Sequence, residues 1–386
     1  MRVYLDYAAT TPLDPRVLEA MKPYFYKKFG NSMSLHSWGL EAKQALEESR
    51  AIVAKFMNAD SEEVIFTGSA TESINFVLKG IAFANKEKGK HIITSAIEHH
   101  AVLESCRWLE KQGFAITYLP VDKYGLIDLK KLRNSIRDDT ILVSIMHANN
   151  EIGTIEPIEE IGKICKEKDV LFHTDAVQSF GKIPIDVNKM NIDLLSLSAH
   201  KFYGPKGVGA TFIRKGTKIE PLLHGGGHEF GLRSSTENVA GIVGLAEAVR
   251  LRKKEMNQEA KKLTKLRDYL IKNVLKIDNS YLNGHPIKRL ANNANFWFAF
   301  IEGEALVIQL DSYGIAASTG SACSSSTLEP SHVLMAIGLK HEEAHGSLRL
   351  SLGKYTTKAE IDYTIKLLPR VVESLRKISP FKGKWK

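Results

Sequence analysis

Apolar and polar positions follow two different periods along the chain. Over residues 40–56 the apolar residues recur every third or fourth position, which predicts an amphipathic helix. Short apolar runs, which predict strands, stand at 64–66, 91–94, 116–119, 141–146, 170–173 and 194–198. Segments of helical period separate most of these runs, so we expect crossover connections and a mostly parallel sheet.

The pattern changes after about residue 255. A charged segment over 251–268 predicts a long helix that leaves the sheet, and strand patterns near 295–301, 315–317 and 348–352 then mix with helical patterns near 304–312 and 358–377. We therefore expect an α/β protein with a large domain over 15–255 and a smaller α+β domain formed by 1–14 and 256–386. Asp14 and Pro15 predict the N-cap and first position of a helix.

Composition narrows the class of protein. Hydrophobic residues make up 44% and charged residues 25% of the 386 residues, as in ordinary globular proteins, and no apolar run reaches the length of a membrane span. Cys106, Cys165 and Cys323 are too widely spaced for a disulfide framework or a four-cysteine zinc site, so a cytoplasmic location is expected.

A formal net charge of +9 can indicate a protein that binds nucleic acid. The basic residues are scattered among 44 acidic ones, and no basic stripe with interleaved aromatic residues occurs, so we expect no direct nucleic-acid partner. A cluster from Arg252 to Lys265 predicts one basic helix face.

Polar residues that follow predicted strands carry the candidate chemistry, because parallel sheets bind ligands at the carboxyl ends of their strands. Asn150, Asp175 and Lys201 each stand shortly after an apolar run. A lysine can condense with the aldehyde of pyridoxal phosphate while a carboxylate keeps the pyridine nitrogen protonated. The alternatives are a helix-capping aspartate and an ordinary turn lysine.

Two further segments fit the same cofactor. The run 67–73 follows a strand and opens a helix, so backbone amides near Ala70 and Thr71 would face a phosphate, although such a run is often only a helix cap. His99 follows another strand, where an imidazole would stack on the ring and exchange protons, or would cap the next helix. Its neighbour His100 is expected to face solvent.

With these motifs in this order, the chain resembles the cysteine desulfurases of the NifS/IscS type, which are fold-type-I pyridoxal phosphate enzymes. The resemblance covers essentially the whole length. It rests on the opening 4–12, on His-Ala-Asn-Asn-Glu-Ile-Gly at 147–153, on Asp-Ala-Val-Gln-Ser at 175–179 and on His-Lys-Phe-Tyr-Gly-Pro-Lys-Gly at 200–207.

The resemblance implies a role for each matching residue. Lys201 would form the Schiff base with the cofactor, Asp175 would bind the pyridine nitrogen and His99 would stack on the ring. Arg349 would hold the substrate carboxylate through paired hydrogen bonds. The remaining implied contacts are Asn150 and Gln178 near the ring hydroxyl, Asn150 also near substrate, Ala70, Thr71, Ser198 and His200 at the phosphate, and Thr236 at the phosphate of the neighbouring subunit of a homodimer.

Cys323 separates this reaction from that of an aminotransferase. It stands among the small hydroxyl residues of 318–327, which favour an exposed loop. The resemblance implies that its thiolate takes the sulfur of L-cysteine as a persulfide, leaves alanine, and passes the sulfur to an acceptor. The acceptor would be an iron–sulfur scaffold protein or a tRNA-thiolating enzyme that docks near the C-terminus, from Ser379 onward, where Cys323 would contact a partner's cluster only transiently.

Some features stand outside this interpretation. Residues 31–34, 67–69 and Ser235 depart from the family pattern, and neither the acceptor nor a preference for cysteine over selenocysteine follows from the sequence. The alternatives are a selenocysteine lyase or another pyridoxal phosphate lyase or aminotransferase. His341-Glu-Glu-Ala-His345 fits the zinc-peptidase pattern, in which both histidines lie on one helix face. Gly338 and Gly346 limit any helix here to little more than one turn, so zinc proteolysis is disfavoured and no metal site is expected.

Overall fold

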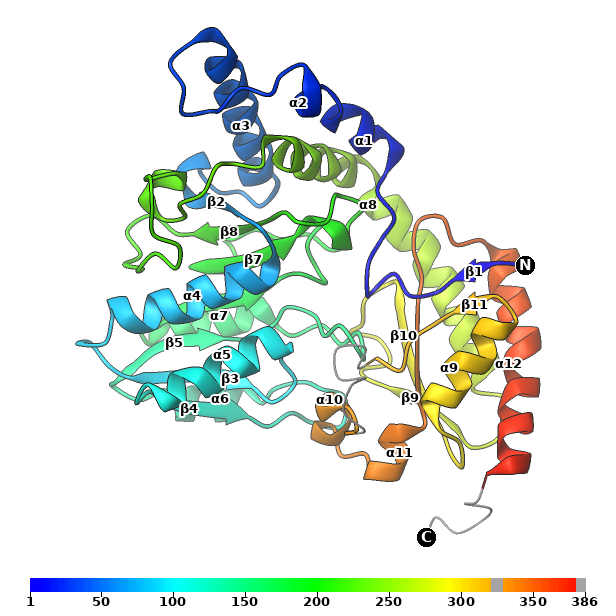
Figure 1. The fold of residues 1–386 in the computed structure, drawn as a ribbon. Coiled ribbons are helices and arrows are strands. Elements are labelled where there is room, and N and C mark those ends of the chain that lie inside the picture. Colours follow the sequence, from blue (N-terminus) through cyan, green and yellow to red (C-terminus); the bar gives the residue numbers. More distant parts are fainter. Residues whose placement is uncertain (321–328, 380–386) are drawn as a thin grey trace.

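The computed structural model describes residues 1–320 and 329–379 (Figure 1). Within these residues the largest sheet has seven strands in the order β2-β8-β7-β6-β5-β3-β4. These strands are β2 (Val64–Thr67), β3 (His91–Ser95), β4 (Ala115–Leu119), β5 (Thr140–Ser144), β6 (Leu171–Asp175), β7 (Leu194–Ser198) and β8 (Gly209–Ile213). The six predicted strands are therefore confirmed, although β5 ends at Ser144 and not at 146.

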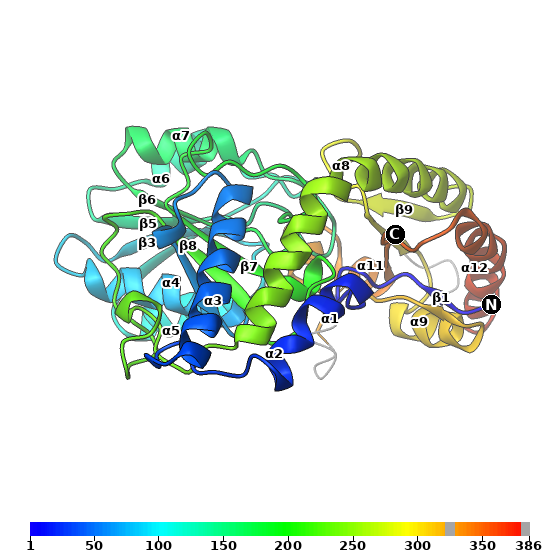
Figure 2. The ribbon, with the colours of Figure 1, turned by 90° about the horizontal axis from the view of Figure 1, so that it is seen from above.

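The sheet is covered by helices on both faces, because its strands bury alternate side chains on opposite sides. In β2, Val64 and Phe66 join one apolar cluster and Ile65 joins the other. The first face carries α3 (Ser37–Phe56), α7 (Ile158–Glu167) and the first part of α8 (Val239–Val274), and the second carries α4 (Ala70–Ala84) and α5 (His100–Lys111). Figures 1 and 2 show α3 and α8 side by side above this sheet.

One strand of the large sheet was not predicted. β8 pairs antiparallel with both β7 and β2, whereas β7, β6, β5, β3 and β4 run parallel. The fold class is as expected, and the sheet is mostly but not wholly parallel.

A second apolar core lies on a three-stranded antiparallel sheet of order β12-β10-β9. The strands are β9 (Ser280–Asn283), β10 (Asn293–Phe298) and β12 (Ser347–Ser351). Helices α9 (Gly303–Ser312), α12 (Lys358–Ile378) and the second part of α8 pack on it, and β1 (Val3–Tyr4) pairs with β11 (Ile315–Ala316) beside them (Figure 1).

Helix α8 passes through the expected domain boundary near residue 255 without a break. Its side chains up to Leu251 belong to the first core, and those from Leu263 onward belong to the second. The division of the chain at about 255 stays a prediction, and α8 is the element that joins the two cores.

The shorter helices complete the described chain. As predicted, Asp14 caps α1 (Pro15–Met21), since its carboxylate accepts from the backbone N–H of Arg16 and Pro15 occupies the first turn. The other short helices are α2 (Pro23–Tyr26), α6 (Leu129–Ser135), α10 (His332–Ala336), α11 (His341–His345) and the single turns Ser61–Glu63, Ala199–Lys201 and Glu229–Gly231. Across 1–320 and 329–379 no helix has the length and apolar character of a bilayer span.

Candidate active site

A cavity of about 350 Å³ lies at the carboxyl ends of the parallel strands. All of the expected cofactor residues except Thr236 line it, together with Arg349 from the small sheet, so segments far apart in sequence meet here. These residues are Ala70, Thr71, His99, Asn150, Asp175, Gln178, Ser198, His200, Lys201 and Arg349.

Lys201 and Asp175 come from neighbouring strands. Strand β7 ends at Ser198 and a single 3-10 turn follows it. Lys201 therefore stands one turn beyond the strand, in agreement with its expected place shortly after an apolar run. Its Nζ donates to the carbonyl oxygens of Ala8 (2.8 Å) and Ala9 (2.7 Å). Asp175 is the last residue of β6, and its burial raises the pKa of its carboxyl to about 6.

His99 serves as a helix cap and also lines the cavity, so the two sequence interpretations are compatible. Its Nδ1 accepts from the backbone N–H of Ala101 at 3.1 Å. Burial, with the nearby charge of Lys201, lowers the pKa of His99 to about 4. The ring is therefore neutral at pH 7, and its single proton is on Nε2.

The N-terminus of α4 forms one wall of the cavity. Ser69 Oγ accepts from the N–H of Glu72 at 3.1 Å and so caps the helix. The amides of Ala70 and Thr71 have no carbonyl acceptor inside the helix, which makes this end a site for an anion. The inverted order Gly68-Ser69 thus places a capping serine where the helix begins.

Arg349 lies on β12 and is almost fully buried. Its Nη2 donates to Asp6 Oδ1 at 2.8 Å and its Nη1 to the carbonyl oxygen of Asn150 at 3.0 Å. Its Nε, also buried, has no hydrogen-bond partner in the described part of the chain. A carboxylate in the cavity would supply that partner.

One predicted site residue among those described, Thr236, is not brought to the cavity. Thr236 is exposed on the segment that precedes α8 and does not line the cavity. Cys323 lies outside the described residues. Cys106 on α5 and Cys165 on α7 are buried, as expected for structural thiols, and burial raises the pKa of each to about 12.

His100, expected to face solvent, is only half-buried, but it faces the cavity. Its ring centroid lies 4.7 Å from that of His332 on α10. No sequence pattern marks His332, because only the fold brings α10 against the start of α5. Ala8 and Ala9 also line the cavity, through the backbone of the N-terminal segment.

The zinc-peptidase pattern falls on the five-residue helix α11. The rings of His341 and His345 lie 4.6 Å apart, and neither histidine lines the cavity. Among residues 1–320 and 329–379 no three histidine, cysteine, aspartate or glutamate side chains are grouped so as to hold a metal ion.

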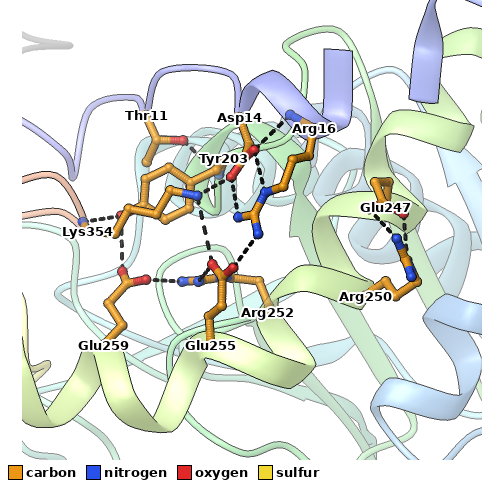
Figure 3. A network of polar contacts seen from close by, with 10 residues as sticks. All are labelled: Thr11, Asp14, Arg16, Tyr203, Glu247, Arg250, Arg252, Glu255, Glu259 and Lys354. Atoms are coloured by element: carbon orange, nitrogen blue, oxygen red, sulfur yellow. Dashed lines mark hydrogen bonds and ion pairs between the residues drawn. The ribbon is translucent and has the colours of Figure 1, made fainter. Parts of the chain in front are cut away.

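A charged network lies behind the lysine turn (Figure 3). Tyr203 has a φ of 71°, and its hydroxyl donates to Glu259 Oε1 at 3.0 Å and accepts from the N–H of Lys354 at 2.7 Å. The Lys354 ammonium in turn pairs with Asp14. The network therefore joins the N-terminal segment, the lysine turn, α8 and the loop after β12.

The Aminotransferase class-V family matches residues 3–364. The chain belongs to this family. Within it the chain groups with the NifS/IscS-type cysteine desulfurases, because it is 60% identical to the "Cysteine desulfurase IscS" of Dictyoglomus turgidum, over 100% of this chain and 98% of the relative. The corresponding protein of Methanosarcina thermophila is 58% identical over 99% of this chain and 95% of its own length.

Solved structures agree with this class-V assignment. A "NIFS-LIKE PROTEIN" superposes with a TM-score of 0.92 at 44% identity, over 97% of this chain and 100% of the other. A structure described as "SspA in complex with cysteine" gives a TM-score of 0.82 at 40% identity, over 92% of this chain and 100% of the other. Class-V aminotransferases generally depend on pyridoxal phosphate.

The cavity described above has the three kinds of group that pyridoxal phosphate needs: a carboxyl for the ring nitrogen, a phosphate site and an amine. Asp175 is a buried carboxyl whose pKa burial raises and the charge of Lys201 lowers, so a protonated ring nitrogen beside it would stabilise its charged form. The start of α4 suits a phosphate, and Lys201 supplies the amine.

Proposed function

We propose that this chain is a pyridoxal phosphate-dependent cysteine desulfurase, which converts L-cysteine to L-alanine and transfers the sulfur through Cys323 to an acceptor. The observation that carries the proposal is the convergence of Lys201, Asp175 and Arg349 on one cavity from three different strands. The family assignment and the full-length identity to IscS proteins support the same reaction.

The residues would divide the work as follows. Ala70, Thr71, Ser198 and His200 would hold the phosphate, and Asp175 would keep the ring nitrogen protonated. The bound cofactor supplies an electron-withdrawing ring conjugated to the substrate α-carbon. Arg349 would bind the substrate carboxylate, with the carbonyl of Asn150 and the carboxylate of Asp6 fixing its guanidinium.

Proton transfer would fall to Lys201 and His99. The Lys201 amine, released when substrate replaces it, would take a proton from the substrate α-carbon and return it to the carbon product. His99 would remain neutral with its proton on Nε2, so it would stack on the ring without adding a positive charge. Neutrality matters because a cation beside the ring would lower the pKa of the ring nitrogen, which Asp175 would keep protonated.

Cys323 would perform the sulfur transfer. Its thiolate would attack the substrate Sγ, so that an S–S bond forms as the substrate Cβ–Sγ bond breaks, and the carbon fragment would take up protons to become alanine.

The persulfide would then pass to a scaffold or tRNA-thiolating acceptor. Docking of that acceptor near the C-terminus stays a prediction, since 380–386 lie outside the described residues. The cytoplasm is the proposed compartment, in keeping with the free thiols of Cys106 and Cys165.

Two variants test the function. Cys323→Ala should abolish sulfide release from cysteine but keep the yellow colour of the bound cofactor, whereas Lys201→Ala should lose the visible absorbance of the Schiff base. Persistent desulfuration by Cys323→Ala would contradict the persulfide route. Release of selenide in strong preference to sulfide would favour the alternative, a selenocysteine lyase.

We also propose a homodimer. A set of large apolar side chains is exposed around α2 and the start of α3: Leu18, Phe25, Tyr26, Phe29, Met33, Leu35, Trp38 and Leu40. Ser32 Oγ, inside this set, donates to Glu237 Oε2 at 2.7 Å, which ties it to the segment of Thr236. A second copy on this surface would bring Thr236 toward the partner's phosphate site.

Leu35→Glu tests the dimer, because Leu35 is 92% exposed in the single chain. Light scattering should give a monomer mass for Leu35→Glu and a dimer mass for Ile287→Glu, a control that is 81% exposed elsewhere. A dimeric Leu35→Glu variant would move the proposed interface away from this surface.

A further inference from the structure

Lys182 is a basic residue beside the site to which the proposed reaction gives no role. It lies four residues after Gln178, and its Nζ donates to Gln178 Oε1 at 3.0 Å. No carboxylate of the described residues forms an ion pair with it. Burial, with the charge of Lys201 as the next cause, lowers the pKa of Lys182 to about 7.

The hydrogen bonds of Gln178 allow only one orientation of its amide. The Lys182 amine donates to the amide oxygen, and the carbonyl of Ala8 can only accept, so Nε2 must face Ala8, at 2.9 Å. The same carbonyl accepts from Lys201 Nζ at 2.8 Å. A continuous chain of hydrogen bonds therefore runs from Lys182 through Gln178 and Ala8 to the cofactor lysine.

The two lysines also share a second, smaller cavity on the side away from the site. It measures about 20 Å³, room for one water molecule, and its polar lining includes Lys182, Lys201, Tyr203, Arg252 and Glu259. Placing two amines at the same small cavity makes it costly to protonate both.

The charges around Lys182 favour its neutral amine. The cations Lys201, Arg252 and Arg349 lower its pKa, whereas the carboxylate Glu259 raises it. Charged or neutral, the amine carries an N–H that can donate to Gln178 Oε1, so this hydrogen bond does not depend on the charge of Lys182.

We propose that Lys182 is a positioning residue: its amine donates to Gln178 Oε1 and so fixes the Gln178 amide with its NH₂ group on the carbonyl of Ala8, beside Lys201. This inference rests on the proposed pyridoxal phosphate chemistry. The effect acts before substrate binds, so it can be measured without turnover.

The test is the rate of cofactor capture. Cofactor-free full-length protein is mixed with pyridoxal phosphate at pH 8, and the rise of the visible absorbance is followed for wild type, Lys182→Met and Lys182→Arg. Lys182→Met removes the donor to Gln178 Oε1, so capture should slow by about tenfold, the worth of one hydrogen bond. Lys182→Arg keeps a donor, so its capture rate should stay with that of wild type.

An unchanged capture rate in Lys182→Met, or an equal loss in Lys182→Arg, would overturn the inference, because the donor would then be irrelevant. Failure of wild type to capture the cofactor would overturn the proposed function as well, which is a different result. Circular dichroism checks folding, and if Lys182→Met does not fold, Lys182→Leu is measured with the same expected loss.

Discussion

The buried ion pair between Arg50 and Glu229 holds a strained segment against the large domain. Arg50 Nη1 and Nη2 donate to the two carboxylate oxygens of Glu229 at 2.7 and 2.9 Å, and both side chains are almost fully buried. Nη1 also donates to the carbonyl of Val64, and the N–H of Phe66 donates to Glu229 Oε2. Glu229 and Phe230 both have positive φ, 50° and 57°, so the pair stabilises an unfavourable backbone conformation.

Arg50→Met should lower the free energy of unfolding by about 3–5 kcal/mol, the cost of leaving a buried carboxylate without its cation. The double variant Arg50→Met with Glu229→Gln should recover most of that loss, because a neutral amide still accepts from Phe66 N–H and no charge is left buried. We expect the double variant to lie within about 2 kcal/mol of wild type.

Urea unfolding followed by circular dichroism and tryptophan fluorescence measures these differences. Arg250→Met is the matched control, since Arg250 forms a similar two-bond pair with Glu247 but its side chain is 53% exposed (Figure 3). This control should lose at most about 1 kcal/mol. The reasoning is refuted if Arg50→Met is as stable as Arg250→Met, or if the double variant is no more stable than Arg50→Met.

Three further predictions follow from buried groups. Arg349→Lys should lower kcat/KM for cysteine by roughly 10- to 100-fold, the worth of one charged hydrogen bond, while thermal stability changes little; equal kinetics would exclude paired binding of the carboxylate. Cys106 and Cys165 should resist alkylation at pH 8 in the folded protein, because burial raises the pKa of each to about 12, and mass spectrometry of the labelled peptides would reveal any reaction. Burial raises the pKa of Glu98 to about 8, above its ordinary value of 4.5, so its contribution to stability is complete below pH 4.5 and is lost as the pH rises toward 8. Glu98→Gln should remove up to about 4 kcal/mol of that alkaline loss, which urea midpoints at pH 5 and 8.5 would measure, and an unchanged difference between the two midpoints would contradict this account.

The large sheet was predictable where its strands are strong apolar runs. All six predicted runs are strands, because a strand buried on both faces leaves a continuous apolar signal. Strand β8 was missed, although its five residues Gly209–Ile213 are all buried. Its first residue is a glycine and its direction depends on pairing with β7 and β2, which lie far apart in sequence.

Much of the site was predictable for a geometrical reason. Parallel strands end at one edge of the sheet, so Asn150, Asp175 and Lys201, each at or shortly beyond the end of a strand, had to lie near one another. Arg349 stands on a different sheet, and no local pattern marks it; only the resemblance to a family indicated its role. His332 carries no such mark, and its place beside His100 depends on the whole fold.

The basic residues show most clearly why charge patterns mislead. Arg252 belongs to a cluster that predicted a basic helix face, yet it is buried and pairs with Glu255 and Glu259 on the same helix. The prediction counted only the cations of the cluster. Arg252 can be buried because the carboxylates of Glu255 and Glu259, three and seven positions further along the helix, pair with it. Lys182 is the reverse case: no local pattern marks it, and its importance arises from its hydrogen bond to Gln178, whose amide in turn donates to the carbonyl of Ala8 in the N-terminal segment. Local sequence therefore indicated several of the groups that we propose do the chemistry, while the groups that orient them depend on contacts that form only when the chain has folded.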